Sequence, residues 1–206
     1  MAFSRIVCFG ASSVYGRKDP EFGGFCGRLK SWHETLDNRN LVYNLGIGGE
    51  TIEQMSLRFS REVPTRKPHL IVFYSGYNDI VRRGSQAAPN TCDLTTYKHA
   101  LNTLFREANA FAKLLVILPL PFDQAQSTPL SGTDWNYLTA DAVEYIRVQQ
   151  TLAQELKLET IDLFFPYLES ASGSRLLSDD GLHPGPAGHA LIFETLRSWL
   201  GTNKAD

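Results

Sequence analysis

The chain has 206 residues, of which 43% are hydrophobic and 20% are charged, and its formal net charge is −2. This composition argues against disorder, and the lack of a basic stripe interleaved with aromatic residues argues against nucleic-acid binding. No apolar run approaches the roughly 20 residues that span a bilayer, and the N-terminal residues lack the longer apolar core of a signal peptide. We therefore expect one domain over residues 1–206 and, by default, a cytoplasmic location.

Strand-like and helix-like patterns alternate along the chain. Short apolar or β-branched runs predict strands, and apolar residues spaced three or four apart predict helices. In chain order the pattern predicts a strand at 5–9, a helix at 27–36, a strand at 41–45, a helix from 51 that ends at Pro64, and a strand at 69–74. It continues with a helix at 94–112, a strand at 114–118, a long irregular segment at 119–138, a helix at 140–156, a strand at 159–163 and a helix at 187–200.

This alternation predicts an α/β fold with a central parallel sheet. The strands at 69–74 and 114–118 are apolar on both faces, as in parallel sheets that helices cover on both sides. In such sheets ligands bind beyond the carboxyl ends of the strands. The turns that follow the strands are therefore where functional residues are expected.

Polar and glycine-rich turns follow the first three predicted strands. They read Gly-Ala-Ser-Ser at 10–13, Gly-Ile-Gly-Gly at 46–49 and Ser-Gly-Tyr-Asn-Asp at 75–79. A fourth segment, Asp-Gly-Leu-His-Pro at 180–184, precedes the last helix. Each piece alone is ordinary turn chemistry, and it is their convergence at one sheet edge that indicates a site.

The residue types in these turns fit a serine hydrolase. A serine hydroxyl needs an adjacent base, histidine supplies one, and an acid partner orients the imidazole. Ser12 lies where a strand turns toward a helix, and the spacing of Asp180 and His183 lets the carboxylate reach the inner ring nitrogen. Gly49 lets a backbone N–H approach a ligand closely, and Asn78 offers a side-chain amide donor.

Together the four segments resemble the four conserved blocks of the SGNH hydrolases, also called the GDSL esterase/lipase family, in order and over nearly the whole chain. The resemblance implies a flavodoxin-like three-layer α/β/α sandwich with about five parallel strands. It implies a catalytic triad with Ser12 as nucleophile, His183 as general base and acid, and Asp180 as its orienting partner. It also implies an oxyanion hole formed by the N–H groups of Ser12 and Gly49 and the side chain of Asn78. Such a reaction needs no cofactor.

One position departs from the family pattern. The family usually has Asp immediately before the nucleophile, and this chain has Ala11. In the family that Asp commonly braces the nucleophile turn, and Ser13 is a hypothetical substitute for it here. The departure removes no member of the triad or of the oxyanion hole.

Other catalytic and cofactor-binding signatures fit less well. The elbow Gly-x-Ser-x-Gly would need glycine where Val14 stands, and a dinucleotide fingerprint from Gly46 would need glycine in place of Thr51. The three cysteines include no CxxC pair, and no His/Asp/Glu spacing suggests a metal centre. The remaining histidines are interpreted as structural: His33, His69, His99 and His189.

The predicted reaction is hydrolysis of a small-molecule carboxylic ester, or of a thioester, through an acyl-Ser12 intermediate. Short acyl groups are favoured because no long apolar lid is evident. Two alternatives stay open, namely a binding module that lost efficient catalysis and an acyltransferase to an acceptor other than water. Two further questions are open. The first is whether the aromatic residues Phe122, Trp135 and Tyr137 wall a pocket or pin the loop to the body. The second is whether Arg82 and Arg83 meet an anionic substrate or belong to a solvated loop.

Overall fold

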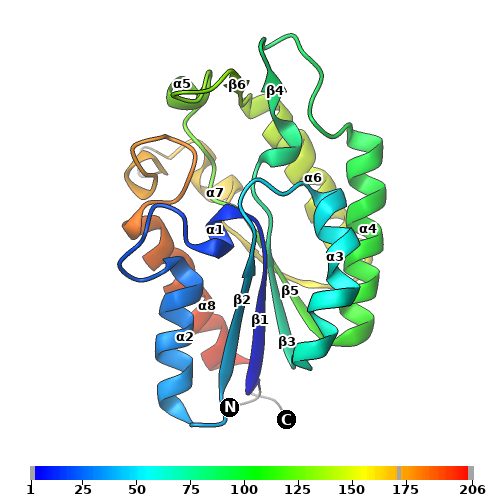
Figure 1. Ribbon diagram of the computed structural model, residues 1–206, viewed down its shortest axis with the longest axis vertical. Helices are drawn as coiled ribbons and strands as arrows, with labels where there is room; N and C mark the ends of the chain where they lie inside the picture. The colour runs from blue at the N-terminus through cyan, green and yellow to red at the C-terminus, as the bar shows by residue number, and fades with distance from the viewer. Residues whose placement is uncertain (1–2, 171–172, 204–206) are drawn as a thin grey trace.

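A central sheet of five parallel strands organises the protein, for which a computed structural model describes residues 3–170 and 173–203. The strand order is β2-β1-β3-β5-β7 (Figure 1). The strands are β1 (Arg5–Gly10), β2 (Leu41–Gly46), β3 (Leu70–Tyr74), β5 (Lys113–Leu118) and β7 (Glu159–Asp162). The predicted parallel sheet of about five strands is confirmed. Residues 1–2, 171–172 and 204–206 of the single domain predicted over 1–206 lie outside the described residues.

Helices cover both faces of this sheet and complete a three-layer sandwich (Figure 1). One face carries α2 (Gly24–Leu36) and α8 (Pro186–Thr202), and the other carries α3 (Ile52–Glu62), α4 (Leu94–Phe111) and α6 (Thr139–Glu155). The short elements are α1 (Ser12–Tyr15), η1 (Pro64–Arg66), η2 (Asn78–Ile80), β4 (Arg82–Arg83), α5 (Gln124–Ser127), β6 (Trp135–Asn136), α7 (Phe165–Leu168) and η3 (Gly173–Leu176).

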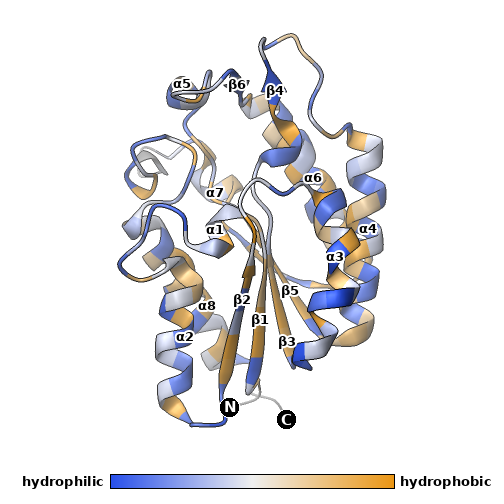
Figure 2. Cartoon of the chain, viewed as in Figure 1, coloured by the Kyte–Doolittle hydropathy of each residue, from blue (hydrophilic) through white to orange (hydrophobic). Residues whose placement is uncertain are grey.

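The strands divide the core into two apolar layers because successive side chains point to opposite faces. On β1, Val7 and Phe9 join the layer beneath α3, α4 and α6, whereas Ile6 and Cys8 join the layer beneath α2 and α8. All five residues of β3 are buried, as predicted for a doubly covered strand. Figure 2 shows the apolar residues gathered on the sheet and on the inward sides of the helices. Full burial of such a side chain contributes about 1.5–3 kcal/mol.

Two parts of the structure differ from the sequence prediction. Helix α2 begins at Gly24, three residues before the predicted start at 27. Gly23 and Gly24 lead into the helix with φ of 67° and 71°, which glycine adopts readily. The segment 119–138, predicted as irregular, contains α5 and also β6, which pairs antiparallel with β4. This ribbon stands above the carboxyl ends of the strands (Figure 1). Among the described residues, no helix is long and apolar enough to cross a membrane.

The topology opens a crevice at the carboxyl ends of β1 and β3. The chain leaves β1 toward β2 at one edge and then returns to place β3 on the other side of β1. At such a switch point the loops after the two strands diverge, and ligands bind between them. Ser12 follows β1 and Asn78 follows β3, so both lie at this crevice.

Candidate active site

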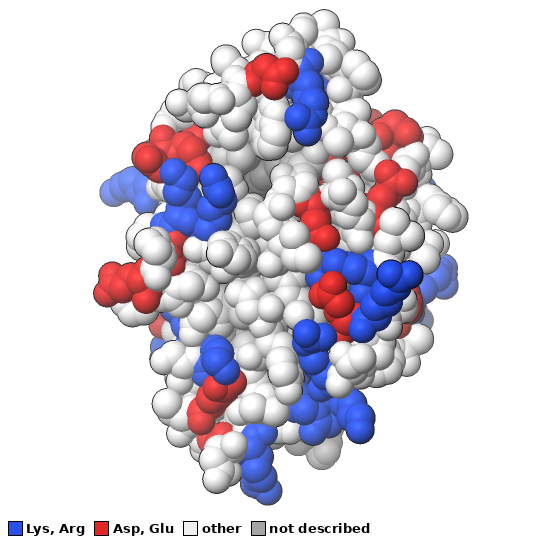
Figure 3. All heavy atoms as spheres, viewed as in Figure 1, with Lys and Arg blue, Asp and Glu red and all other residues white. Residues whose placement is uncertain are grey.

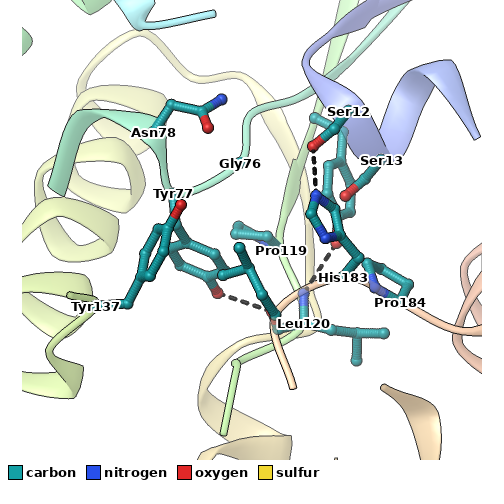
Figure 4. Close-up of a pocket in the computed structure, with 12 residues that line it drawn as sticks. Ser12, Ser13, Gly76, Tyr77, Asn78, Pro119, Leu120, Tyr137, His183 and Pro184 are labelled. Carbon is teal, nitrogen blue, oxygen red and sulfur yellow. Dashed lines mark hydrogen bonds between the residues drawn. The ribbon is translucent and has the colours of Figure 1, made fainter. Parts of the chain in front are cut away.

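Three of the predicted residues form one hydrogen-bonded chain at the crevice. The Ser12 Oγ lies 3.0 Å from His183 Nε2, and His183 Nδ1 lies 2.8 Å from Asp180 Oδ2. Figure 4 shows the first of these bonds at the mouth of a pocket. The side chains of His183 and Asp180 are largely buried, which shields their interaction from solvent.

The Asp180 carboxyl is held as a carboxylate. Burial raises its pKa, but the His183 ring, the N–H groups of His183 and Leu182, and the Ser178 hydroxyl all hydrogen-bond to it and hold the pKa well below its usual range. A carboxylate only accepts hydrogen bonds, so His183 Nδ1 must donate to it. The neutral imidazole then leaves Nε2 free to accept the proton of Ser12.

A tight turn before α8 brings Asp180 and His183 into this geometry. The Ser178 N–H donates to the His183 carbonyl at 2.9 Å, which closes the turn. Gly181 has a φ of 65° within it, and a Cβ there would lie 2.5 Å from the Gln126 side chain. The Gly-Leu pair between Asp180 and His183 thus supplies the reversal that this spacing needs.

The turn that presents Ser12 is held by backbone packing and by its neighbours. A Cβ on Gly10 would lie 2.0 Å from the Tyr74 carbonyl oxygen, so only glycine allows β1 and β3 to approach this closely. Ala11 is fully buried and offers no side-chain cap to α1. The Asn44 side chain donates to the Val14 carbonyl at 2.8 Å and so ties α1 to β2.

Ser13, the hypothetical substitute for the missing Asp, contacts Tyr74 on β3. The Ser13 hydroxyl interacts with the phenol of Tyr74, whose pKa is raised by burial. That contact links α1 to β3. The substitution of Ser13 for the missing Asp at position 11 therefore stays a hypothesis.

The three residues predicted to supply oxyanion donors line one cleft together with His183. The N–H of Gly49 donates to no residue of the described chain, and Gly49 has a φ of 83° with open space around its Cα. The Asn78 Nδ2 donates to the Glu50 carbonyl at 2.8 Å. Because an amide nitrogen carries two hydrogens, this bond orients the second one for another acceptor. Figure 4 shows Asn78 across the pocket from Ser12.

Two hollows, an inner one and an outer one, share Ser12 and His183 among their lining residues. The inner one is a cavity of about 20 Å³ whose walls include Gly76, Pro119, Leu120 and Tyr137. The outer one is a cleft of about 610 Å³. Its outer walls include Arg17, Lys18, Ser131, Thr133 and Trp135. Figure 3 shows the surface hollowed in the upper half of the molecule, with charged side chains beside the hollow.

The aromatic and arginine questions raised by the sequence have structural answers. Tyr137 lines both spaces and Trp135 lines the cleft, whereas Phe122 packs edge-on against Tyr77 and Tyr137 and pins the loop. Arg82 is neither a free rim cation nor a solvated side chain, because it forms a two-pronged ion pair with Asp141 at 2.6 and 2.8 Å. Arg83 lies over the Trp135 ring at 4.7 Å.

Three of the four other histidines make contacts outside this chain of hydrogen bonds. His33 interacts with the Phe3 carbonyl at 2.8 Å, and His69 with the Arg5 guanidinium at 2.7 Å. His189 is buried and bridges the Phe25 N–H and the Arg17 carbonyl, at 3.2 and 3.0 Å. These contacts support the structural interpretation of all three side chains.

Sequence reasoning missed two residues beside the site, Arg58 and Glu50. The Arg58 guanidinium binds the Glu50 carboxylate and also reaches the carbonyls of Gly10 and Leu45. The sequence holds only a hint of Arg58, since it lies three residues from Met55 on the side of α3 that faces the core. A charge at such a position requires a buried partner.

A parallel α/β sandwich with a Ser–His–Asp chain at its switch point has the architecture of a flavodoxin-like serine hydrolase. The model of the GDSL-like lipase/acylhydrolase family matches residues 8–191. The chain belongs to this family and is an enzyme of the GDSL-type esterase class, acting on small-molecule esters, as the sequence resemblance predicted.

Individual relatives have low sequence identity to this chain but match it over most of its length. An acetylxylan esterase from Geobacillus stearothermophilus is 25% identical over 180 residues, covering 85% of this chain and 78% of that protein. Among solved structures, the lipase/acylhydrolase from Enterococcus faecalis has a TM-score of 0.78 at 23% identity, covering 98% of this chain and 96% of that one. An acetylxylan esterase structure from G. stearothermophilus has a TM-score of 0.70 at 20% identity, with coverages of 96% and 92%. These structures share the fold of this chain.

Proposed function

We propose that this protein hydrolyses short-acyl carboxylic esters through an acyl-Ser12 intermediate, with its site built in a single catalytic domain. The observation that carries the proposal is the hydrogen-bonded chain from Asp180 through His183 to the Ser12 Oγ, which ends beside a small cavity. The Ser12 hydroxyl has a base, His183, within hydrogen-bond distance, and Asp180 already orients that base.

In the proposed mechanism, Ser12 Oγ attacks the ester carbonyl while His183 Nε2 takes its proton. The resulting oxyanion accepts hydrogen bonds from the N–H groups of Ser12 and Gly49 and from the free N–H of Asn78. Collapse of the tetrahedral intermediate expels the alcohol, which receives the proton from His183. The imidazole then takes a proton from water, the hydroxide attacks the acyl-enzyme, and the acid is released as the proton returns to Ser12.

The preference for short acyl groups follows from the inner cavity. Its volume of about 20 Å³ is close to that of one or two buried waters, which suits the methyl of an acetyl group. The wall at Leu120 is fixed, because its N–H donates to the Tyr74 hydroxyl at 3.1 Å and its carbonyl accepts from the Tyr77 hydroxyl at 2.7 Å. A longer chain would have to displace this hydrogen-bonded wall.

The alcohol portion of the substrate is assigned to the outer cleft. This cleft is far larger than the inner cavity, and its walls combine Arg17, Ser131 and Thr133 with the ring of Trp135. Polar groups of this kind suit an alcohol that carries several hydroxyls. Acetylated carbohydrates are therefore the first natural substrates to test, all the more since one relative is an acetylxylan esterase.

A panel of nitrophenyl esters from acetyl to decanoyl tests the proposal, with the Ser12→Ala variant beside the native protein. We expect the acetyl ester to give the highest kcat/KM and Ser12→Ala to lose nearly all turnover while keeping its fold. Labelling of Ser12 by a fluorophosphonate separates an active enzyme from a binding module. Acyl-CoA substrates and added alcohols reveal thioesterase or acyl-transfer activity, and full activity of Ser12→Ala would refute the mechanism.

A further inference from the structure

Arg58 is a buried cation at the centre of the loops that carry the site. It projects from α3. Its side chain is 11% exposed, and that of its partner Glu50 is 12% exposed. Its Nε lies 2.9 and 2.7 Å from the two Glu50 carboxylate oxygens, and its Nη1 lies 3.0 Å from Glu62 Oε2. The guanidinium also stacks over the Phe9 ring at 4.3 Å. One face and all three nitrogens of the guanidinium are thus engaged.

The same guanidinium reaches the backbone of two strand ends. Its Nη2 donates to the Gly10 carbonyl at 3.2 Å and to the Leu45 carbonyl at 2.9 Å. Gly10 ends β1 two residues before Ser12, and Leu45 lies on β2 just before the loop that contains Gly49. One side chain therefore sets the spacing between the turn of the nucleophile and the loop of the predicted backbone donor.

A second link runs through Glu50 to the third predicted donor. The Glu50 side chain is clamped by Arg58, and the Glu50 carbonyl accepts the hydrogen bond of Asn78 Nδ2 at 2.8 Å. The carbonyl that orients the Asn78 amide thus belongs to a residue whose side chain Arg58 holds. Ser12, Gly49 and Asn78 are in this way connected to a single guanidinium.

Local structure alone does not supply this connection. Ala11 has no polar side chain to hold the turn, and the loop at Gly49 has open space around it. A buried ion pair is weak evidence for stability, because desolvation of the two charges offsets their attraction. The ion pair can nevertheless fix positions, since the planar guanidinium donates in several fixed directions at once.

We propose that Arg58 is a positioning residue that holds the Ser12 turn, the Gly49 loop and the Asn78 amide in register for ester hydrolysis. The proposal rests on the proposed function of these three residues. Small displacements in such a site are costly, since an error of about 1 Å can lower a rate by about 100-fold. The loss should appear in kcat more than in KM, because oxyanion contacts form in the transition state.

The test compares Arg58→Lys with Arg61→Lys, an exposed arginine on the same helix. Lysine keeps the charge but loses the fork that spans the carboxylate and both carbonyls. For nitrophenyl acetate we expect kcat of Arg58→Lys to fall about 10- to 100-fold with little change in KM. Fluorophosphonate labelling of Ser12 should slow in parallel, and Arg61→Lys should match the native protein. Guanidinium at non-denaturing concentration should restore part of the kcat of Arg58→Ala, which a purely structural role would not predict.

Glu50→Gln provides a second variant that keeps Arg58 and the Glu50 carbonyl. It removes the charge that orients the guanidinium, so kcat should fall in the same direction but by less. If both Arg58 variants fail to fold, unchanged kcat in Glu50→Gln overturns the proposal, and a lowered kcat at unchanged KM supports it. Folded Arg58→Lys with native kcat and labelling rate also overturns it. In that case an inactive Ser12→Ala would leave the proposed function standing, whereas an active Ser12→Ala would remove the ground for both.

Discussion

At the scale of single residues, the proposed triad requires Asp180 to be a carboxylate. Its Oδ1 accepts hydrogen bonds from the Ser178 hydroxyl and from two backbone N–H groups, and its Oδ2 faces the His183 ring. All of these neighbours present a hydrogen to the carboxylate. An amide in its place would have to turn a donor toward at least one of them.

We therefore expect Asp180→Asn to lower kcat by about 10³- to 10⁴-fold, as when the orienting acid of a triad becomes an amide. An Asn NH₂ facing Nδ1 would favour the imidazole tautomer with its hydrogen on Nε2, which cannot accept the Ser12 proton. Steady-state kinetics with nitrophenyl acetate measures the loss, and circular dichroism checks the fold. Asp179→Asn is the matched control, since Asp179 is 83% exposed and pairs with Lys18. Near-native kcat in Asp180→Asn would exclude the assigned role.

Asp79, next to Asn78, has a raised pKa, in contrast to the lowered pKa of Asp180. Its carboxyl is buried, and burial raises its pKa to about 7 despite hydrogen bonds from the Ile52 N–H and Cys92, with Glu53 adding repulsion. Between about pH 4 and pH 7 the folded state therefore retains a proton that the unfolded state has lost. The contribution of Asp79 to the free energy of unfolding thus decreases as pH rises through this window and is constant above it.

The variant Asp79→Asn removes this titration. The free energy of unfolding of Asp79→Asn, measured by urea at pH 5 to 8, should rise relative to that of the native protein as pH increases. Asp93→Asn is the control. Hydrogen bonds from Thr96 lower the pKa of Asp93, so its titration changes the free energy of unfolding only below about pH 4 and not in the measured range. A pH-independent difference between Asp79→Asn and the native protein would contradict the assigned titration.

At the scale of elements, the sequence predicts what local patterns determine. The strand expected at 114–118 is observed as Lys113–Leu118, and the helix expected at 94–112 as Leu94–Phe111. Burial on two faces and a 3.6-residue period are local signals, so they can be read from one segment. The pairing of β4 with β6 could not be predicted, since two-residue strands have no period and meet only through the fold.

The candidate site follows the same division. Ser12 and Asn78 could be located because they directly follow predicted strands, and Asp180 with His183 because they share one short turn. Arg58 could not, since its partners come from β1, β2 and the loop after β2. Contacts between distant segments determine its environment, and the spacing of its own helix gives only the hint of a charge on a buried side.

The ribbon of β4 and β6 is anchored to α6 by Arg82. This side chain binds Asp141 twice and the Ala88 carbonyl at 2.6 Å, and Asn90 also donates to Asp141. Arg82→Ala leaves the Asp141 carboxylate with a single partner, so the free energy of unfolding should fall by about 1–3 kcal/mol. Hydrogen exchange at 82–83 and 135–136 should accelerate in the same variant.

Arg83→Ala is the matched control for this anchor. The Arg83 guanidinium lies over the exposed side of the ribbon at Trp135, where a cation–π contact contributes about 0.5–1 kcal/mol. We expect a smaller loss of stability and slower exchange in the ribbon than with Arg82→Ala. Equal effects of the two substitutions would show that Arg82 is not the anchor.

At the scale of the whole molecule, the site and the core occupy different parts of the same sheet. The apolar layers run along the strands beneath the helices, whereas the candidate catalytic groups are gathered beyond the carboxyl ends. Helix α8 begins just after His183 and extends along one face of the sheet, away from the candidate site. A substitution far along α8 should therefore change the stability of the protein without changing its catalytic rate.

Leu196 provides this test, because it is fully buried in the layer beneath α2 and α8 and lies ten residues from the start of α8, about 15 Å along the helix axis. Leu196→Ala should lower the free energy of unfolding by about 2–5 kcal/mol, through lost burial and the cavity left behind. The kcat for nitrophenyl acetate should stay native below the melting temperature, since no strand end moves. Leu57→Ala, at a position 77% exposed on α3, should change neither quantity. A loss of kcat in fully folded Leu196→Ala would mean that packing beneath α8 transmits to His183, and the separation of core and site would have to be abandoned.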